Sequence, residues 1–271
     1  MFPVLLVLLP AALSSAAPPE DSTGLKFTVA FPENIAYYHP NKPENKIKIT
    51  ALYNNTEVII KKYTSYITGQ TLSSGQTWEY APAAGLELAR AKISNHTLQI
   101  TGTKTITVHV VFLKNSSVQT TLVIPTDKLG TEYLIPPVPL IEGTTHPAAN
   151  VTVDVTERGP FRLIIINTDQ KNKVTIQGAV PKDVWLQPHQ VTQVWVKQEE
   201  ALQAVKAEQP VAVLFGHTCA IRHSCTCGQL YTMLPPASEE HLKFYVPPVL
   251  AKDAEGQLAP QSSTARAYSS L

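Results

Sequence analysis

The chain has 271 residues, a formal net charge of +1 and only 16% charged residues. It is long enough for one large domain or two smaller ones with cores of their own. A charge so close to zero gives no bulk field that would favour nucleic acid or an anionic membrane as a partner. The chain has 22 Pro and only 2 Met, and Val, Ile and Thr recur throughout, which favours strands and loops over helices.

The N-terminus reads MFPVLLVLLPAALSSAAPPED, an apolar run that ends in small residues. Ser15 and Ala17 fit the small-residue rule for cleavage, which predicts a signal peptide over residues 1–17. A buried apolar strand is the alternative interpretation. The run is too short to span a bilayer, and no later segment approaches about eighteen apolar residues. We therefore expect a secreted mature chain without a membrane span.

Four Asn-x-Ser/Thr triplets support the prediction of secretion because they match the acceptor for N-glycosylation. The acceptors are Asn54, Asn95, Asn115 and Asn150. A glycan cannot be buried, so each acceptor that carries one is expected on a surface loop or at a strand end.

Three short segments that begin at Leu25, Gly130 and Leu242 resemble one another. Each has an aromatic residue, then an aliphatic residue two positions later, and Pro close behind. After the first segment, KIKITALYNNTEVIIKKY is followed by LQITGTKTITVHVVFLKN; after the second, FRLIIINTDQKNKVTIQG is followed by LQAVKAEQPVAVLFGHTC. The matching order predicts an internal repeat.

Each repeat spans about 105 residues and holds roughly seven strand patterns at 8–12-residue spacing. This spacing is typical of a Greek-key-like β-sandwich. The predicted fold is therefore all-β, with two tandem sandwich-like units at residues 25–128 and 129–241. The run Leu163–Ile166 is apolar at every position, which predicts a central strand covered on both faces.

Residues 242–250 resemble the first strand of a further unit, and the tail that follows does not continue it. Residues 251–271 are polar, rich in small residues and aperiodic, so we expect them to be disordered. On this interpretation the chain is a truncated isoform or a fragment of a longer array of units.

All three cysteines lie in the stretch PVAVLFGHTCAIRHSCTC, together with His217 and His223. The favoured interpretation is a disulfide between Cys219 and either Cys225 or Cys227, at the turn after an apolar strand. Closing so short a loop stabilises by about 2–3 kcal/mol in the chain-entropy model. One cysteine is left over and could pair with another chain.

Two other interpretations of this stretch are open. A metal site would use the cluster from His217 to Cys227, although zinc needs four converging ligands, and HxC and CxC spacings place ligands on opposite faces of an extended chain. A catalytic thiol would need a His base and an oxyanion hole. The sequence contains no GxSxG, Walker, HExxH or GxGxxG motif, so we predict no enzyme, no cofactor and no bound metal.

The three tryptophans, Trp78, Trp185 and Trp195, lie in strand-like contexts. We therefore expect them in the core rather than on a ligand-binding surface. The sequence alone identifies no ligand-binding residue.

The motifs FTVAFPENIAYYHP, GTEYLIPP and PVAVLFGHTCAIRHSC, followed by MLPP and YVPP, resemble the N-terminal domain of the IgG Fc-binding protein family. The similarity runs from Lys26 to Pro248. Members of that family are secreted, mucus-associated glycoproteins, so the resemblance implies a noncovalent binding module with IgG Fc or mucin-type glycoproteins as partners.

Two features depart from the family pattern. The family domain is longer, and Cys225 and Cys227 straddle the position of its second cysteine, which leaves the disulfide pairing open. A structural role in an extracellular gel, through the odd cysteine, is the alternative function. The resemblance carries over no residue that contacts Fc, so the ligand-binding residues stay unassigned.

Overall fold

The computed structural model describes residues 22–34, 43–88, 92–114, 117–137, 144–146, 151–153, 161–196, 201–221, 227–237, 249–252 and 258–261. Strands make up nearly all of the regular structure, and the helical segments described are single 3-10 turns, η2 (Ala84–Leu86) and η3 (Thr126–Lys128). The predicted all-β fold is confirmed. The predicted signal peptide, residues 1–17, lies outside the described residues.

No helix in the described part of the chain has the length and hydropathy needed to cross a membrane.

The chain divides into two compact units, residues 1–237 and 238–271. In the second unit, β21 (Val249–Lys252) and β22 (Leu258–Gln261) pair as an antiparallel hairpin. This hairpin begins at the end of the segment predicted as a further first strand, and it extends into the segment predicted as a disordered tail. The rest of the second unit lies outside the described residues.

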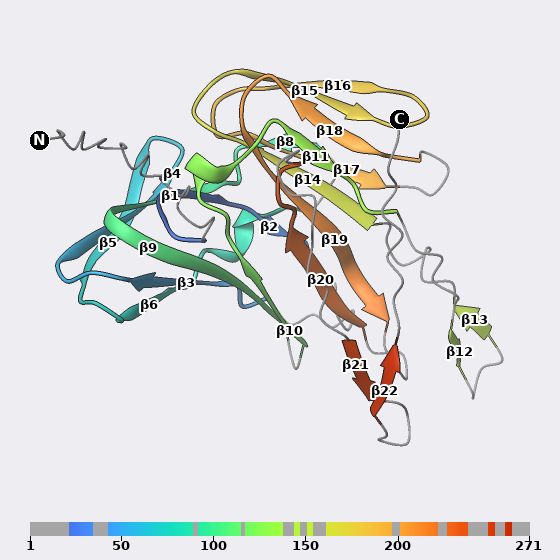
Figure 1. Cartoon of the computed structure of the whole chain (residues 1–271), viewed down its shortest axis with the longest axis horizontal. Helices are drawn as coiled ribbons and strands as arrows, with labels where there is room; N and C mark the ends of the chain where they lie inside the picture. Colours follow the sequence, from blue (N-terminus) through green and yellow to red (C-terminus); the bar gives the residue numbers. More distant parts are fainter. Residues whose placement is uncertain are drawn as a thin grey trace, which may run out of the picture. The chain divides into compact units, whose positions relative to one another are not determined.

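The first half of unit 1 forms a seven-stranded sheet, which we name the N-terminal sheet (Figure 1). Its strands lie in the order β5-β4-β9-β3-β6, and β1 and β10 also pair with β9. The strands are β1 (Gly24–Val29), β3 (Lys46–Ala51), β4 (Thr56–Lys62), β5 (Ser65–Leu72), β6 (Thr77–Tyr80), β9 (Leu98–Lys114) and β10 (Ser117–Leu122). Polar and apolar residues alternate along β3, so Ile47, Ile49 and Ala51 are buried on one face.

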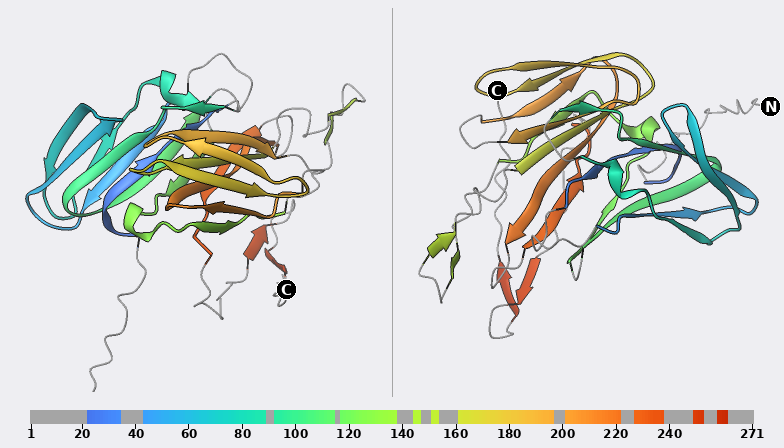
Figure 2. Two further views of the ribbon diagram at one scale, coloured as in Figure 1. Left: turned by 90° about the horizontal axis from the view of Figure 1, so that it is seen from above. Right: turned by 180° about the vertical axis from the view of Figure 1, so that it is seen from behind.

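The second half of unit 1, with one short strand from the first half, forms two further sheets, and their strands between residues 161 and 233 are yellow to orange in Figure 2. The central sheet has the order β20-β19-β14-β17-β8, and the outer sheet has the order β11-β18-β15-β16. The strands of the central sheet are β8 (Ile93–Ser94), β14 (Phe161–Asn167), β17 (Val191–Val196), β19 (Val211–Ile221) and β20 (Cys227–Met233). Those of the outer sheet are β11 (Glu132–Leu134), β15 (Asn172–Gln177), β16 (Lys182–Leu186) and β18 (Ala204–Ala207).

Two small pairs complete the described part of unit 1. A parallel pair joins β2 (Phe31–Pro32) to β7 (Glu87–Leu88). An antiparallel hairpin joins β12 (Thr144–His146) to β13 (Val151–Val153).

The central sheet is buried on both faces. Odd-numbered residues of β14, such as Leu163 and Ile165, pack in one hydrophobic core with residues of the outer sheet. Even-numbered residues, such as Ile164 and Ile166, pack in a second core with residues of the N-terminal sheet. The central-strand prediction for Leu163–Ile166 is confirmed, because β14 lies between β17 and β19 and none of its four apolar side chains is exposed.

The strands of the two halves pair in the same order. In the first half, β3 pairs with β6 and β9, and β4 pairs with β5 and β9. In the second half, β14 pairs with β17 and β19, and β15 pairs with β16 and β18. This order is what a repeated unit would produce, and the repeat itself stays an interpretation of the sequence.

The halves differ where β9 runs as one long strand while its counterpart is split into β18 and β19. The split falls at Glu208–Pro210, where Pro210 has no N–H to contribute to a strand ladder. The Asn172 side chain replaces the missing ladder, because its Oδ1 accepts from the N–H groups of Glu208 and Gln209 at 3.1 Å each. The break lets β18 and β19 enter different sheets.

The two halves are also joined across the predicted boundary between residues 128 and 129. The short strand β8 comes from the first half, yet it pairs with β17 of the second half through Ser94 and Ile93. The hydroxyl of Thr97 donates to the carbonyl of His189 at 2.7 Å. The boundary stays a prediction, and these contacts link the segments on either side of it.

Because each face of β14 belongs to a different core, truncation on either face should destabilise the protein. We expect Ile164→Ala and Ile165→Ala each to lower the free energy of unfolding by about 2–5 kcal/mol, from lost burial plus a cavity. Urea unfolding followed by fluorescence measures both values. Val180→Ala, at a side chain that is 81% exposed, is the control. A wild-type midpoint for either isoleucine variant would contradict burial on both faces.

Candidate binding surface

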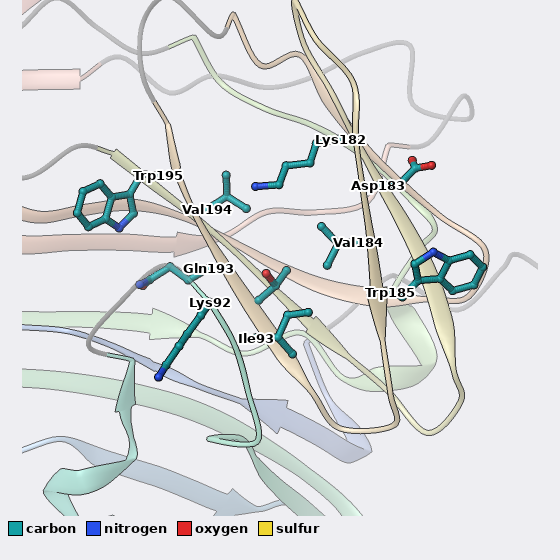
Figure 3. A pocket seen from close by; sticks show the side chains of 10 residues that line it. Lys92, Ile93, Lys182, Asp183, Val184, Trp185, Gln193, Val194 and Trp195 are labelled. Atoms are coloured by element: carbon teal, nitrogen blue, oxygen red, sulfur yellow. The ribbon is translucent and has the colours of Figure 1, made fainter.

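An open groove of about 580 Å³ lies along the margin of the outer and central sheets (Figure 3). Residues 182–185 of β16 form one wall, and residues 192–195 of β17 form the other. Lys92 and Ile93, at the start of β8, close the lower side in the view of Figure 3. The groove therefore runs between an edge strand of one sheet and the outermost strands of the next.

Two exposed tryptophans flank this groove on opposite sides, with Val184 and Val194 between them (Figure 3). Trp185 is 55% exposed and Trp195 is 42% exposed. The prediction that both lie in the core is wrong, whereas Trp78 is partly buried and packs against a core. Alternation along β16 explains Trp185, since Val184 and Leu186 face the core and Trp185, between them, points outward.

Basic side chains surround Trp185. Lys171 Nζ lies 5.5 Å from the centre of its ring and Lys173 Nζ lies 6.0 Å from it, within cation–π range. Lys173 also pairs with Asp183 at 2.9 Å, and the hydroxyl of Thr175 donates to the Asp183 carboxylate at 2.7 Å. The hydrogen bonds from Lys173 and Thr175 hold the pKa of Asp183 below its ordinary value. This carboxylate therefore stays ionised and paired with Lys173.

A partly buried ion pair supports the Trp195 side of the groove. The guanidinium carbon of Arg162 lies 5.8 Å from the centre of the Trp195 ring. Arg162 is only 3% exposed, pairs with the Glu33 carboxylate at 3.0 Å and donates to the Gln193 side chain at 3.4 Å. Because Arg162 is buried and bonded at both ends, Trp195 packs on a supported side chain.

The comparisons with known proteins connect this framework to one family. The model of the family described as IgGFc binding protein matches residues 119–268. The human IgGFc-binding protein is 31% identical over 196 residues, which cover 70% of this chain and 3% of that protein.

The chain belongs to the IgGFc-binding protein family. It spans only a small part of the length of its human relative. The family is one of binding proteins rather than of enzymes. The residues that the family model matches include β16 and β17, and thus both long walls of the groove.

The cysteine stretch falls partly outside the described residues. Cys219 lies in β19 and Cys227 begins the neighbouring strand β20, where it is opposite Ile221. Cys225 lies outside the described residues, so the disulfide stays a prediction. Cys219 therefore lies within a strand that runs on to Ile221, and not in a turn directly after the apolar run as expected.

The two histidines of this stretch differ in what the structure describes. His217 is 1% exposed, and its ring packs edge-on against Phe161, with 5.0 Å between the ring centres. His223 lies outside the described residues. Within the described part of the chain, no three His, Cys, Asp or Glu residues lie close enough to hold a metal ion.

Two of the four predicted glycosylation sites lie in described segments. Asn54 is exposed in the turn between β3 and β4, and its Oδ1 accepts from the N–H of Ser74 at 2.9 Å. Asn95 is exposed beside β8. Asn115 and Asn150 lie outside the described residues.

A polar cluster that sequence reasoning missed holds the segment Phe31–Asn34 behind the groove. The Gln229 side chain donates to the carbonyl oxygens of Pro32 and Glu33 at 3.1 and 3.3 Å. Lys114 Nζ donates to the carbonyl oxygen of Asn34 at 2.9 Å. These contacts fix Glu33, which in turn pairs with Arg162 beneath Trp195.

Glu87 belongs to the same cluster. Its carboxylate accepts from the Asn45 side chain at 2.9 Å. Burial raises the pKa of Glu87 to about 7, and the nearby Glu33 carboxylate adds to the rise, against the opposing effects of Asn45, Asn34 and Lys114. Glu87 is therefore protonated in much of the folded population at a pH where an exposed glutamate is ionised.

The raised pKa of Glu87 should make the folded state less stable as the pH rises. Between the ordinary pKa near 4.5 and the folded pKa of about 7, the folded state binds more protons than the unfolded state, so the free energy of unfolding falls. Glu87→Gln removes this titration, and we expect it to stabilise by about 1–3 kcal/mol at pH 8 but little at pH 4. Urea unfolding from pH 4 to 8 tests this, and parallel pH curves for variant and wild type would contradict it.

Proposed function

We propose that this chain is a secreted, non-enzymatic binding module that recognises protein partners through the groove between β16 and β17. Membership of a family of binding proteins supports noncovalent recognition. The observation that carries the proposal is the pair of exposed tryptophans, Trp185 and Trp195, on a rigid all-β framework. Tryptophan and arginine dominate the energetic centres of protein interfaces, and here Arg162 lies against Trp195.

The partners we propose are IgG Fc and mucin-type glycoproteins. The first follows from the name of the human relative, which shares 31% of its residues with this chain over the aligned region. Binding at mucosal surfaces would follow if the chain is secreted, as its N-terminal sequence and its Asn-x-Ser/Thr triplets predict. The groove is open to solvent, which suits a macromolecular ligand better than an enclosed cavity does.

Removal of both tryptophans should weaken partner binding. We expect the Trp185→Ala, Trp195→Ala double variant to lose at least about tenfold in affinity for the partner, because anchor aromatics contribute about 2 kcal/mol or more each. Surface plasmon resonance with immobilised IgG Fc, and separately with purified mucin, measures the change. Tyr66→Ala is the matched control, since Tyr66 is an aromatic residue 63% exposed on β5.

Each arm of that measurement has an outcome against the proposal. Absence of wild-type binding to Fc at micromolar concentration would remove Fc as a partner, and the same result with mucin would remove mucin. An unchanged affinity of the double variant, or an equal loss with Tyr66→Ala, would show that the groove is not the binding surface.

The secretory route predicts glycans at Asn54 and Asn95, both exposed. We expect the protein secreted from mammalian cells to lose mass on treatment with peptide-N-glycosidase, and Asn54→Gln and Asn95→Gln each to remove one glycan. Substitution of the asparagine is the better design, because the hydroxyls of Thr56 and Thr97 are buried and donate to main-chain carbonyls at 2.6 and 2.7 Å. Intact-mass spectrometry gives the result, and an unmodified mass for the secreted wild type would contradict it.

A further inference from the structure

The groove has a property that its side chains alone do not show: its β16 wall is an open strand edge. Within the described residues, β16 pairs only with β15. The carbonyl oxygens of Lys173 and Gln177 in β15 accept from N–H groups on the β18 side, at 3.1 and 2.8 Å. Odd-numbered residues of β15 therefore point to β18, and even-numbered residues point to β16.

This alternation determines which residues of β16 direct their N–H and C=O groups toward β15. Val174 of β15 lies opposite Val184, so even-numbered residues of β16 bond to β15. The N–H and C=O groups of Asp183 and Trp185 consequently point away from the sheet, toward the open edge. An open edge is a template on which another strand can form main-chain hydrogen bonds.

The β17 wall of the groove, which faces β16, is also an open strand edge over its second half. The N–H of Asn167 donates to the carbonyl of Gln190 at 2.8 Å, so even-numbered residues of this segment bond to β14. The main-chain groups of Gln193 and Trp195 therefore point outward, and β8 pairs only with Val191 and Thr192. The β16 edge, which has no second partner strand in the described chain, is the longer of the two.

The charge around the β16 edge indicates the kind of strand that it accepts. Lys92, Lys171 and Lys182 are exposed and form no salt bridge within the described residues. The neighbouring carboxylate, Asp183, is already paired with Lys173. The edge thus presents unpaired positive charge, which attracts an acidic segment.

The same charge disfavours a second copy of this chain. A symmetric pairing of two β16 edges would bring the lysines of one copy against those of the other, and lysine on an edge strand is a common means of blocking self-association. An acidic extended segment of a different protein meets no such repulsion.

We propose that an extended acidic segment of a partner protein adds to the edge of β16 as an extra strand, with Trp185 contacting the side chains on its outer face. This inference rests on the proposed function, since it names how the groove would hold a protein partner. Main-chain hydrogen bonds to Asp183 and Trp185 supply the alignment, and the lysines supply the preference for acidic residues.

The test begins with a displayed library of random peptides of about twelve residues, selected against the wild-type protein. We expect the enriched peptides to be acidic and to lack central Pro, because Pro cannot contribute its N–H to a ladder. No enrichment, or enrichment without acidic bias, would overturn the proposal.

A matched pair of variants at one position then separates main chain from side chain. Asp183→Pro removes the outward N–H, while Asp183→Ala keeps it. We expect Asp183→Pro to weaken an enriched peptide by at least about tenfold and Asp183→Ala to leave its affinity unchanged or higher. Equal affinities for the two variants would refute strand addition.

Three further measurements keep the result interpretable. If Asp183→Pro lowers the melting temperature of the protein, binding is measured instead with two N-methylated versions of the enriched peptide, one methylated at odd positions and the other at even positions. Only the version whose methyl groups replace the N–H groups that face β16 should lose binding. Sedimentation of the wild-type protein that shows a dimer abolished by Asp183→Pro would make the occupant a second copy and overturn the acidic partner. If Asp183→Pro binds Fc or mucin normally while the double tryptophan variant does not, strand addition fails and the proposed function stands.

Discussion

The burial of the central sheet on both faces is the constraint on which the rest of the structure depends. Strands of such a sheet cannot alternate between apolar and polar residues, because each face lies in a core. β14 and β19 meet this demand with continuous apolar runs, Leu163–Ile166 and Val211–Phe215. The N-terminal sheet and the outer sheet pack against opposite faces of this sheet, so neither core is complete without it.

Polar groups in the central sheet are consequently confined to the strand ends and margins. At one end of the pairing between β14 and β19, Arg162 lies opposite Gly216 and His217 lies opposite Phe161. Buried charge is costly unless paired, and Arg162 is paired with Glu33 from the first half of the chain. Removing one partner of such a pair costs more than the pair contributes, so this contact fixes the segment before β3 and the support of Trp195 together.

Local patterns in the sequence predict the elements that depend on neighbouring residues. The Asn54–Asn55 turn between β3 and β4 forms as expected, with Asn55 at φ 54°, a conformation that asparagine tolerates well. The all-apolar run of β14 identifies a central strand because no other location removes both faces from water. These features are set by residue type and spacing within one segment.

Features that depend on distant partners could not be predicted in the same way. Ile93 and Ser94 carry no signal that they join β17 almost a hundred residues later, because a two-residue strand is stabilised by its partner rather than by its own sequence. The groove depends on that pairing and on which strands end at an edge. The spacing of Val184 and Leu186 in β16 was the available signal for Trp185, since these two residues occupy the core face and Trp185 lies between them. Tryptophan is buried in most strands, and this general tendency led to the wrong prediction for Trp185.

The open edge of β16 can promote aggregation, and it can also bind the strand of a partner. Unpaired N–H and C=O groups on β16 would promote aggregation if the strand were flat and apolar. Lysines beside the edge oppose pairing with like-charged copies, and exposed Trp185 lies among them with Lys171 and Lys173 over its ring. A cation held against an aromatic ring keeps both groups ordered before a ligand arrives, which lowers the entropy that binding must overcome. The lysines that oppose self-association are thus also suited to select an acidic partner. Because they serve both roles, the large apolar ring of Trp185 can stand exposed at the edge of a sheet.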